Sequence, residues 1–421
     1  MGRIGIEKMR VYPCSMAMDM HSLVEARGGN VAEVCGDMMI TERSVNPPWE
    51  DPVTMAVNAA RDLLNDEDRR SVKLLLVASE SAPDQEKALS TWIQRYLDLP
   101  DDCRNLEVKH ACYGGSGALN LALAWLHAEA EEGDKALVIC TDQSRAHFNR
   151  PYEFVMGAGA VAMLLSRDAD FFHIDRGLSG LFTHEVSDLI RPTSRVEAGH
   201  SETSLLSYID AVDTAFKRYC EKVDAKRGVA LANLQAIQSW FPRQIYHAPF
   251  GGITRRAHRA VMRSLPDFNA KIVAKDYEER VLPSLGFNRR MGGTYAGSVF
   301  ISLLTLAGEI SSTDDDYPSE NRVGIYSYGS GSTGEFYSGC FGKSAKQSAL
   351  QADLPGLLDA RLNLTLAEYE AAEGARLDHI DKSDFEVNLS GFRNWYMTAY
   401  KGQKKLCFRG ASEHIRLYEW S

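Results

Sequence analysis

One cysteine stands out as a group that could do chemistry. Cys112 follows an apolar, strand-like run over residues 106–111 and precedes the small residues 114–117 and an apolar stretch over 118–128. This pattern predicts a thiol at the N-terminus of a buried helix, where unpaired N–H groups and the helix dipole stabilise a thiolate. Such a thiolate can carry an acyl group, and the Cys112 N–H can serve as an oxyanion donor. A cysteine that merely packs is the alternative on local grounds.

A carboxylate and an imidazole follow two other predicted strands. Glu80 comes just after the apolar run 73–77, and ligands of open α/β sheets gather outside such strand ends. A glutamate in a partly dry site has a raised pKa and can abstract a weakly acidic proton. His247 lies between an extended run and a Pro/Gly turn, and imidazole shuttles protons near neutral pH. From position alone, a solvated loop glutamate and a structural histidine are the simpler interpretations.

A glycine-rich run over residues 329–334 follows a predicted strand at 323–328. Its main-chain N–H groups could face an anion or a nascent oxyanion. It has no Gly-Lys-Ser/Thr sequence and no acidic residue at the distance that dinucleotide binding requires, so it does not indicate a nucleotide site. A tight turn is the alternative interpretation.

The elements that must position these groups alternate along the chain. Apolar strands separated by helices indicate sheets covered on both faces, in two α/β halves joined by a helical middle. Residues 191–204 and the acidic segment 311–321 are expected to be loops. Helices are predicted over 51–64, 85–97, 118–130, 207–223, 255–264 and 295–307, and strands over 73–77, 106–111, 136–140, 159–165 and 323–328.

Composition narrows the class of protein. The 421 residues carry a net charge of −10, which argues against general nucleic-acid binding. No apolar run is long enough to span a membrane, and the first residues lack the apolar core of a signal peptide. The eight cysteines are scattered, without C-x-x-C pairs or histidines at zinc spacing, so we expect a reducing cytoplasm and no metal site.

Taken together, these segments resemble the 3-hydroxy-3-methylglutaryl-CoA synthase family of thiolase-fold condensing enzymes. The resemblance implies a five-layered αβαβα fold built from two similar halves, residues 1–170 and 171–421, in a homodimer with no metal or other cofactor. It makes Glu80, Cys112 and His247 the expected catalytic residues, and Asp142, Asp188 and Ser330 expected substrate-binding residues. The motifs that carry it are 77–81 with Asp84 and Lys87, 109–113, Asp142 with 157–164, 188–192, 246–250 and 327–331.

The chemistry implied by this resemblance is an aldol addition. Cys112 accepts an acetyl group from a thioester, and Glu80 removes a proton from its methyl group. The Cys112 N–H and the Ser330 loop are expected to stabilise the enolate oxygen. The enolate attacks the β-ketone of a second thioester, His247 protonates the alkoxide, and water hydrolyses the Cys112 thioester.

Several features resemble the polyketide β-branching enzymes of the family, which act on carrier-protein-bound substrates. These are the segments 49–54 and 417–421, and Gly252, which replaces a lysine that binds coenzyme A in the primary enzymes. Arg256, Arg259 and Arg263 form a basic stripe at helical spacing that could dock acidic donor and acceptor acyl carrier proteins. A solvated helix face is the alternative for the stripe.

One position departs from the family pattern. Gly293 replaces the asparagine that binds the keto oxygen of the acceptor, which leaves room for an altered acceptor or a less active enzyme. The other functions considered are a primary-metabolic hydroxymethylglutaryl-CoA synthase, a ketoacyl synthase or acyltransferase of the same fold, and a non-catalytic scaffold for carrier proteins.

Overall fold

A nine-stranded mixed sheet runs through the computed structural model, which describes residues 3–145, 147–310 and 321–421. Only two residue pairs, Gly5–His173 and Ile6–Phe172, join β1 to β8 and so connect two parts of the sheet. The strands in spatial order are β5 (Arg104–Val108), β4 (Val72–Ala78), β6 (Lys135–Gln143), β7 (Ala158–Ser166), β1 (Gly5–Tyr12), β8 (Phe172–Thr183), β13 (Thr333–Phe341), β12 (Arg322–Gly329) and β11 (Arg243–Tyr246).

The two parts of the sheet repeat one pairing pattern. In the first part, β1 pairs antiparallel with β7, β7 antiparallel with β6, and β6 parallel with β4. In the second part, β8 pairs antiparallel with β13, β13 antiparallel with β12, and β12 parallel with β11. Strand β5 extends the first part by one parallel strand. The predicted construction from two similar halves is confirmed.

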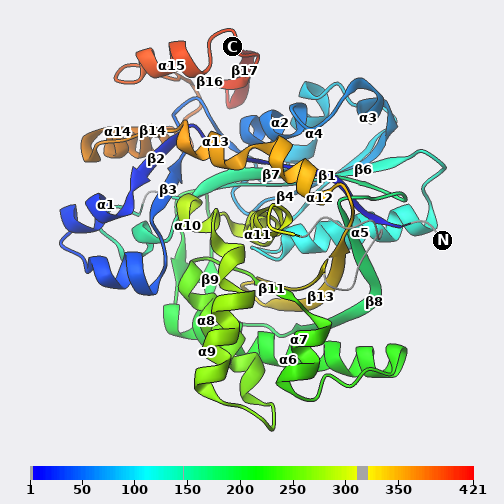
Figure 1. Cartoon of the computed structure of the whole chain (residues 1–421). Coiled ribbons are helices and arrows are strands. Elements are labelled where there is room, and N and C mark those ends of the chain that lie inside the picture. Colours follow the sequence, from blue (N-terminus) through cyan, green and yellow to red (C-terminus); the bar gives the residue numbers. More distant parts are fainter. Residues whose placement is uncertain (1–2, 146, 311–320) are drawn as a thin grey trace.

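Helices separate and cover the two parts, giving the expected five layers (Figure 1). The middle layer holds α5 (Gly114–Ala128) and α11 (Ser298–Ala307), which share one core with strands of both parts. On β4, alternate residues face opposite ways: Leu74 and Leu76 join this middle core, whereas Leu75 and Val77 pack under α2 (Pro52–Arg61) and α4 (Leu89–Tyr96). Strands with two apolar faces therefore need helices on both sides.

The outer layer of the second part consists of α6 (Ser201–Arg227), α8 (Gly251–Arg263) and α9 (Ala270–Arg280). A fourth core gathers β2 (Met16–Asp19), β3 (Glu42–Val45), α14 (Leu366–Asp378) and α15 (Arg393–Ala399) around Trp49. The remaining elements are α1 (Met20–Ala26), α3 (Asp66–Ser71), α7 (Leu234–Trp240), α10 (Asn288–Met291), α12 (Ala345–Ala352), α13 (Leu354–Asp359), the short helical turns η1 (Ala32–Asp37), η2 (Pro151–Phe154), η3 (Leu282–Leu285) and η4 (Tyr295–Gly297), and the strands β9 (Leu189–Ile190), β10 (Ala198–Gly199), β14 (Leu362–Asn363), β15 (Phe385–Glu386), β16 (Leu406–Ser412) and β17 (Ile415–Trp420).

Several predicted boundaries were displaced. The strand expected over 106–111 ends at Val108, and the helix expected from residue 118 begins at Gly114, so a tight turn replaces the last part of the strand. The loop expected over 191–204 contains β10 and the first turn of α6. Residues 311–320 of the predicted acidic loop lie outside the described residues. Within the described ranges, no helix is both long and apolar enough to cross a bilayer.

Candidate active site

A cavity of about 1180 Å³ brings residues from both halves together. Its wall includes all three predicted catalytic residues, Glu80, Cys112 and His247, which come from three different loops. Among the other predicted residues, Gly293, Ser330 and Arg256 also line the cavity. Asp142, Asp188, Arg259 and Arg263 do not belong to its wall.

Cys112 lies on a sharp turn between β5 and α5. Two main-chain bonds close the turn: Tyr113 N donates to His110 O at 3.1 Å, and Gly114 N to Ala111 O at 3.2 Å. Ala111 has φ +40°, a conformation that costs free energy for a non-glycine residue and is found preferentially at functional sites. Gly329 packs so closely on this turn that a Cβ there would lie 2.6 Å from both His110 O and Tyr113 N. The β12–β13 turn thus lies directly against the candidate nucleophile.

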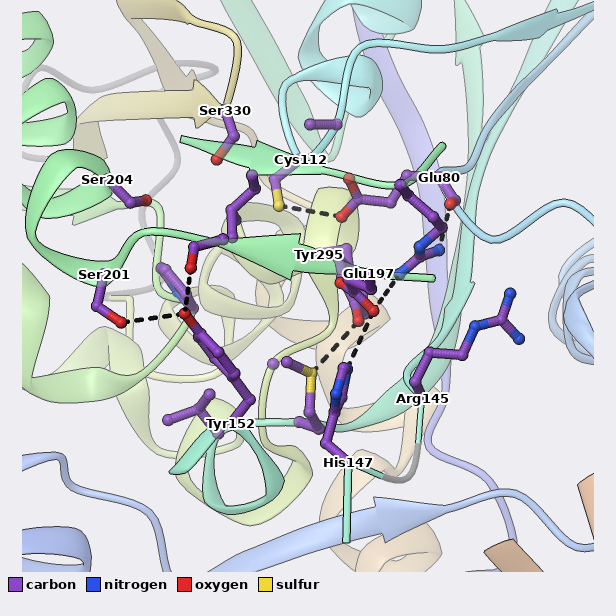
Figure 2. A pocket seen from close by; sticks show the side chains of 18 of the residues that line it. Glu80, Cys112, Arg145, His147, Tyr152, Glu197, Ser201, Ser204, Tyr295 and Ser330 are labelled. Carbon is purple, nitrogen blue, oxygen red and sulfur yellow. Dashed lines mark hydrogen bonds and ion pairs between the residues drawn. The ribbon is translucent and has the colours of Figure 1, made fainter. Parts of the chain in front are cut away.

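Cys112 and Glu80 form a partly buried pair in the cavity wall, in which Cys112 Sγ donates to Glu80 Oε1 at 3.4 Å (Figure 2). Burial, followed by the charge of Glu80, raises the pKa of the Cys112 thiol well above its usual value. The prediction that the helix N-terminus holds Cys112 as a thiolate is therefore wrong for this structure. Cys112 precedes Tyr113, the N-cap of α5, and desolvation is the largest cause of its raised pKa. A neighbouring base is needed to remove the thiol proton.

Burial also raises the pKa of Glu80 to about 8, with a further contribution from the nearby Asp142. Asp142 Oδ1 accepts hydrogen bonds from Glu80 N at 2.9 Å, Ser79 Oγ at 3.1 Å and Ser81 Oγ at 2.8 Å. Asp142 was expected to bind substrate, but the structure places its carboxylate behind the cavity wall. There it holds the loop that carries Glu80 and disfavours the ionised form of that residue.

His247 is buried and hydrogen-bonded from several sides. Its Nδ1 lies 2.8 Å from Ser298 Oγ, at the start of α11, and its main-chain N donates to Tyr326 O at 2.8 Å. The Tyr208 hydroxyl donates to the His247 carbonyl at 2.8 Å. Burial lowers the pKa of His247 to about 3, so the imidazole is neutral at physiological pH. The expectation of a histidine that titrates near neutrality is corrected to a neutral hydrogen-bonding group.

Asp188 bonds to residues on either side of Ser330 in the connection between β12 and β13, and to His200 before α6. Its Oδ1 accepts from Gly331 N at 3.0 Å, its Oδ2 accepts from the Tyr328 hydroxyl at 3.4 Å, and its carbonyl accepts from His200 N at 2.8 Å. The side chain is fully buried and lies outside the cavity wall. The structure thus gives Asp188 a role in positioning the Ser330 loop, where the sequence predicted a contact with substrate.

Two glycines of the site have no space for a side chain. A Cβ on Gly293 would lie 2.6 Å from Val155 O, and the Gly293 N–H donates to that same oxygen at 2.9 Å. A Cβ on Gly252 would lie 2.0 Å from Asp37 O. The backbone around these positions has therefore closed in, and neither an asparagine at 293 nor a lysine at 252 fits without a shift of the main chain.

A second group of polar residues in the cavity was missed by the sequence analysis. Glu197 binds Arg191 Nη2 at 3.0 Å and His147 Nε2 at 3.1 Å (Figure 2). Arg191 also donates to the Glu80 carbonyl, and its charge opposes the rise in the pKa of Glu80. Arg191 and Glu197 belong to the segment 189–199, which we call the flap; β9 and β10 pair at its base. The motif 188–192 already contained Arg191, but nothing in the sequence paired it with Glu197 or His147.

The predicted basic stripe lies on the exposed face of α8. Arg256, Arg259 and Arg263 are exposed, and none of them forms an ion pair with the residues that the structure describes. Arg256 is at the cavity wall, so the stripe begins at the opening and runs away from it. Over the described ranges, no group of three or more His, Cys, Asp or Glu side chains is arranged to hold a metal ion.

Comparisons with known proteins agree with this fold. Residues 3–170 match the domain family described as hydroxymethylglutaryl-coenzyme A synthase N terminal, and residues 259–397 match its C-terminal counterpart. The polyketide biosynthesis 3-hydroxy-3-methylglutaryl-ACP synthase PksG of Bacillus subtilis is 34% identical, over 99% of both chains. The hydroxymethylglutaryl-CoA synthase of Enterococcus faecalis is 29% identical over 93% of this chain and 98% of its own.

Solved structures give the same result. The crystal structure of the curacin biosynthetic pathway HMG synthase superposes with a TM-score of 0.90 at 33% identity, covering 99% of this chain and 100% of that one. Both the sequence and the structure match these proteins over nearly their full length. Members of this family are condensing acyltransferases, and this chain is therefore an enzyme of that class. The chain belongs to the hydroxymethylglutaryl-CoA synthase family.

Proposed function

We propose that this enzyme adds an acetyl or small acyl unit to the β-ketone of a polyketide thioester held on a carrier protein. The observation that carries the proposal is the Cys112–Glu80 pair, 3.4 Å apart, in one cavity with His247. A nucleophile, a base for carbon acid chemistry and a hydrogen-bond donor are the groups that this reaction needs. The similarity to the B. subtilis and curacin synthases supports a polyketide acceptor.

The reaction begins with acyl transfer. Cys112 Sγ bonds to the donor carbonyl carbon, the bond from that carbon to the pantetheine sulfur breaks, and the thiol proton passes through Glu80 to the departing sulfur. Glu80 then takes a proton from the acetyl methyl group. Main-chain N–H groups of Cys112 and the Ser330 loop stabilise the enolate oxygen.

Carbon–carbon bond formation uses the neutral His247. Ala248 N donates to Ser298 Oγ at 3.4 Å, which leaves the serine proton free to bind His247 Nδ1. The imidazole proton then sits on Nε2 and hydrogen-bonds the oxygen of the acceptor ketone as the enolate attacks; the alkoxide ends with the proton that Glu80 took from the methyl group, so Glu80 and His247 both return to their starting states. Water finally cleaves the Cys112 thioester and releases a carboxylate and the free thiol.

Carrier proteins are the proposed bearers of both substrates. Structures of the curacin synthase in complex with its donor-ACP support a donor carrier protein, and the unpaired stripe on α8 supplies a complementary surface for an acidic partner. The closed main chain at Gly252 and Asp37 argues against a lysine-assisted coenzyme A site. Use of carriers also distinguishes the proposal from a primary-metabolic synthase.

A homodimer is proposed through the edge strand β5. This strand has a free edge in the sheet, and Leu106 on β5 and Leu121 on α5 are about half exposed, at 51% and 54%. Pairing of two β5 strands would satisfy the free main-chain groups and bury both leucines. A Leu106→Lys variant is expected to elute at monomer mass in light-scattering chromatography; a dimer of unchanged mass would contradict this interface.

All eight cysteines are free, which supports a cytoplasmic location.

Intact-protein mass spectrometry tests the function directly. Incubation with an acetylated carrier protein and a 3-oxoacyl carrier protein is expected to acetylate Cys112 and to yield the branched adduct on the acceptor carrier. Glu80→Gln should slow the acetylation of Cys112, because the base for the thiol proton is lost, and should form the adduct about 10²–10⁴-fold more slowly even from enzyme that has been acetylated. Cys112→Ser abolishes acetylation, whereas the control Cys35→Ser, outside the cavity wall, reacts normally. Acetylation without any adduct would favour an acyltransferase, and no acetylation a scaffold.

A further inference from the structure

Arg145 is a cation in the cavity wall without a partner. It follows β6 and makes no hydrogen bond or ion pair with the described residues, and its Nε is fully buried and unsatisfied. Burial lowers the pKa of Arg145 to about 10, so the group still carries its charge at neutral pH. An unpaired guanidinium in a partly dry site costs free energy that a bound anion would offset.

The neighbouring charges do not neutralise Arg145. The charge of Glu197 acts on Arg145, but Glu197 is already bound to Arg191 and His147. Arg191 and Arg376 both act on Arg145 as like charges. This end of the cavity therefore has an excess of positive charge.

The position of Arg145 separates it from the reacting thiol. Figure 2 shows its guanidinium on the far side of Glu197 from Cys112, with no interaction drawn to it. Arg145 also acts on the charge of Asp381, which binds Ser194 and Arg195 at the tip of the flap. Arg145 thus lies at the flap end of the cavity.

A hydroxyl donor lines the same cavity beside Ser194. Thr193 Oγ1 accepts hydrogen bonds from Arg195 N at 3.3 Å and Val196 N at 3.1 Å, so its own proton remains available. A guanidinium fork and a hydroxyl are donors that suit the two oxygens of a carboxylate.

We propose that Arg145, with Thr193, forms a subsite for a carboxylate at the distal end of the acceptor's acyl chain. The inference rests on the proposed function and adds to it a class of acceptor. Cavity volume agrees, since 1180 Å³ exceeds the usual range of small-ligand pockets, about 300–1,000 Å³. The pantetheine phosphate is assigned instead to the exposed Arg256 at the opening by α8.

Two carrier-bound acceptors of equal length test the subsite: 3-oxoadipyl, which ends in a carboxylate, and 3-oxohexanoyl, which ends in a methyl group. The wild-type enzyme is expected to favour 3-oxoadipyl by about 10–100-fold in kcat/KM. This factor corresponds to the free energy of one charge-assisted hydrogen bond. In Arg145→Gln this ratio should fall to about one. The control Arg150→Gln, an exposed arginine on the same loop outside the cavity wall, should keep the wild-type ratio.

A wild-type ratio near one, or a ratio in Arg145→Gln equal to that of the wild type, would overturn the subsite. A slower acetylation of Cys112 by the donor carrier in Arg145→Gln would assign the arginine to the phosphate and overturn it as well. If neither acceptor forms an adduct, the proposed function fails, and glutarate binding measured by calorimetry still decides the subsite. Glutarate should bind the wild type and lose at least about tenfold in affinity in Arg145→Gln; equal affinities would contradict the subsite.

Discussion

At the scale of single residues, burial sets the protonation state of the candidate catalytic groups. It raises the pKa values of Cys112 and Glu80 and lowers that of His247. The site therefore rests without a net charge on these three side chains near neutral pH. Glu80 can take the thiol proton or the methyl proton only in the fraction of molecules in which its carboxyl is ionised.

The raised pKa of Glu80 predicts a pH dependence with a definite sign. Glu80 acts as a base only when ionised, so its rate of methyl-proton abstraction should rise with pH and level off above about 8. Deuterium uptake into the acetyl group of acetyl-Cys112, followed by mass spectrometry, measures this step. A plateau already reached near pH 5 would contradict the assignment.

The same pKa has a consequence for stability. The folded carboxyl titrates near 8 and the unfolded one near its usual 4.5, so the folded state holds an extra proton between these values. Stability therefore falls as pH rises through this window. The Glu80→Gln variant should lack this fall of stability with pH. Its unfolding measured against pH is therefore an independent control for the kinetic result.

At the scale of elements, α8 connects the catalytic loop to the protein surface. His247 lies just before the helix, Arg256 is at the cavity wall, and Arg259 and Arg263 continue the stripe outward. Gly251 and Gly252 pack against the 37–39 segment, which fixes the start of the helix. A carrier protein bound along this helix would thus have its prosthetic arm at the opening of the cavity.

Charge reversal on α8 is expected to weaken carrier use selectively. Arg259→Glu with Arg263→Glu should slow the acetylation of Cys112 by an acetyl carrier protein about tenfold at low salt, with a smaller effect at high salt. Acetyl-pantetheine, which has no protein surface, reports whether the site itself is intact. Lys271→Glu with Lys275→Glu on the adjacent helix α9 is the matched control. An equal loss in both double variants would refute specific docking.

At the scale of the whole molecule, the C-terminal segment closes over the first half. Asn58 on α2 pairs with the main chain of Leu406 on β16 through two bonds, Nδ2 to Leu406 O at 3.1 Å and Leu406 N to Oδ1 at 2.8 Å. The Tyr400 hydroxyl donates a hydrogen bond to Glu50 Oε1 at 2.5 Å, and Arg416 Nη2 donates one to Asp51 Oδ2 at 2.7 Å. These bonds link residues more than 300 positions apart.

Loss of the Asn58 bonds should destabilise the fold. Asn58→Ala leaves the buried N–H and C=O of Leu406 unpaired and is expected to lower the free energy of unfolding by about 1–3 kcal/mol per unsatisfied group, measured in urea. Asn394→Ala, an exposed asparagine in the same C-terminal segment, should have almost no effect. Equal unfolding curves for the two variants would show that the Asn58 bonds contribute nothing.

Local patterns were sufficient to predict much of this protein. Apolar runs located the strands β4, β6, β7 and β12, because a strand buried on both faces must be apolar throughout. Residue types at strand ends, together with the family resemblance, pointed to Glu80, Cys112 and His247. Boundaries next to glycine-rich turns were less well predicted, as at Val108 and Gly114, since close packing rather than propensity decides where such elements end.

The sequence by itself thus determined the order of the elements and the kinds of chemical groups at their ends. Only the tertiary structure decided how those groups behave. Asp142, 62 positions from Glu80, raises its pKa, and the carbonyls of Asp37 and Val155 close the space at Gly252 and Gly293. Desolvation, charge and excluded volume depend on residues brought together from distant parts of the chain, and no local pattern contains them.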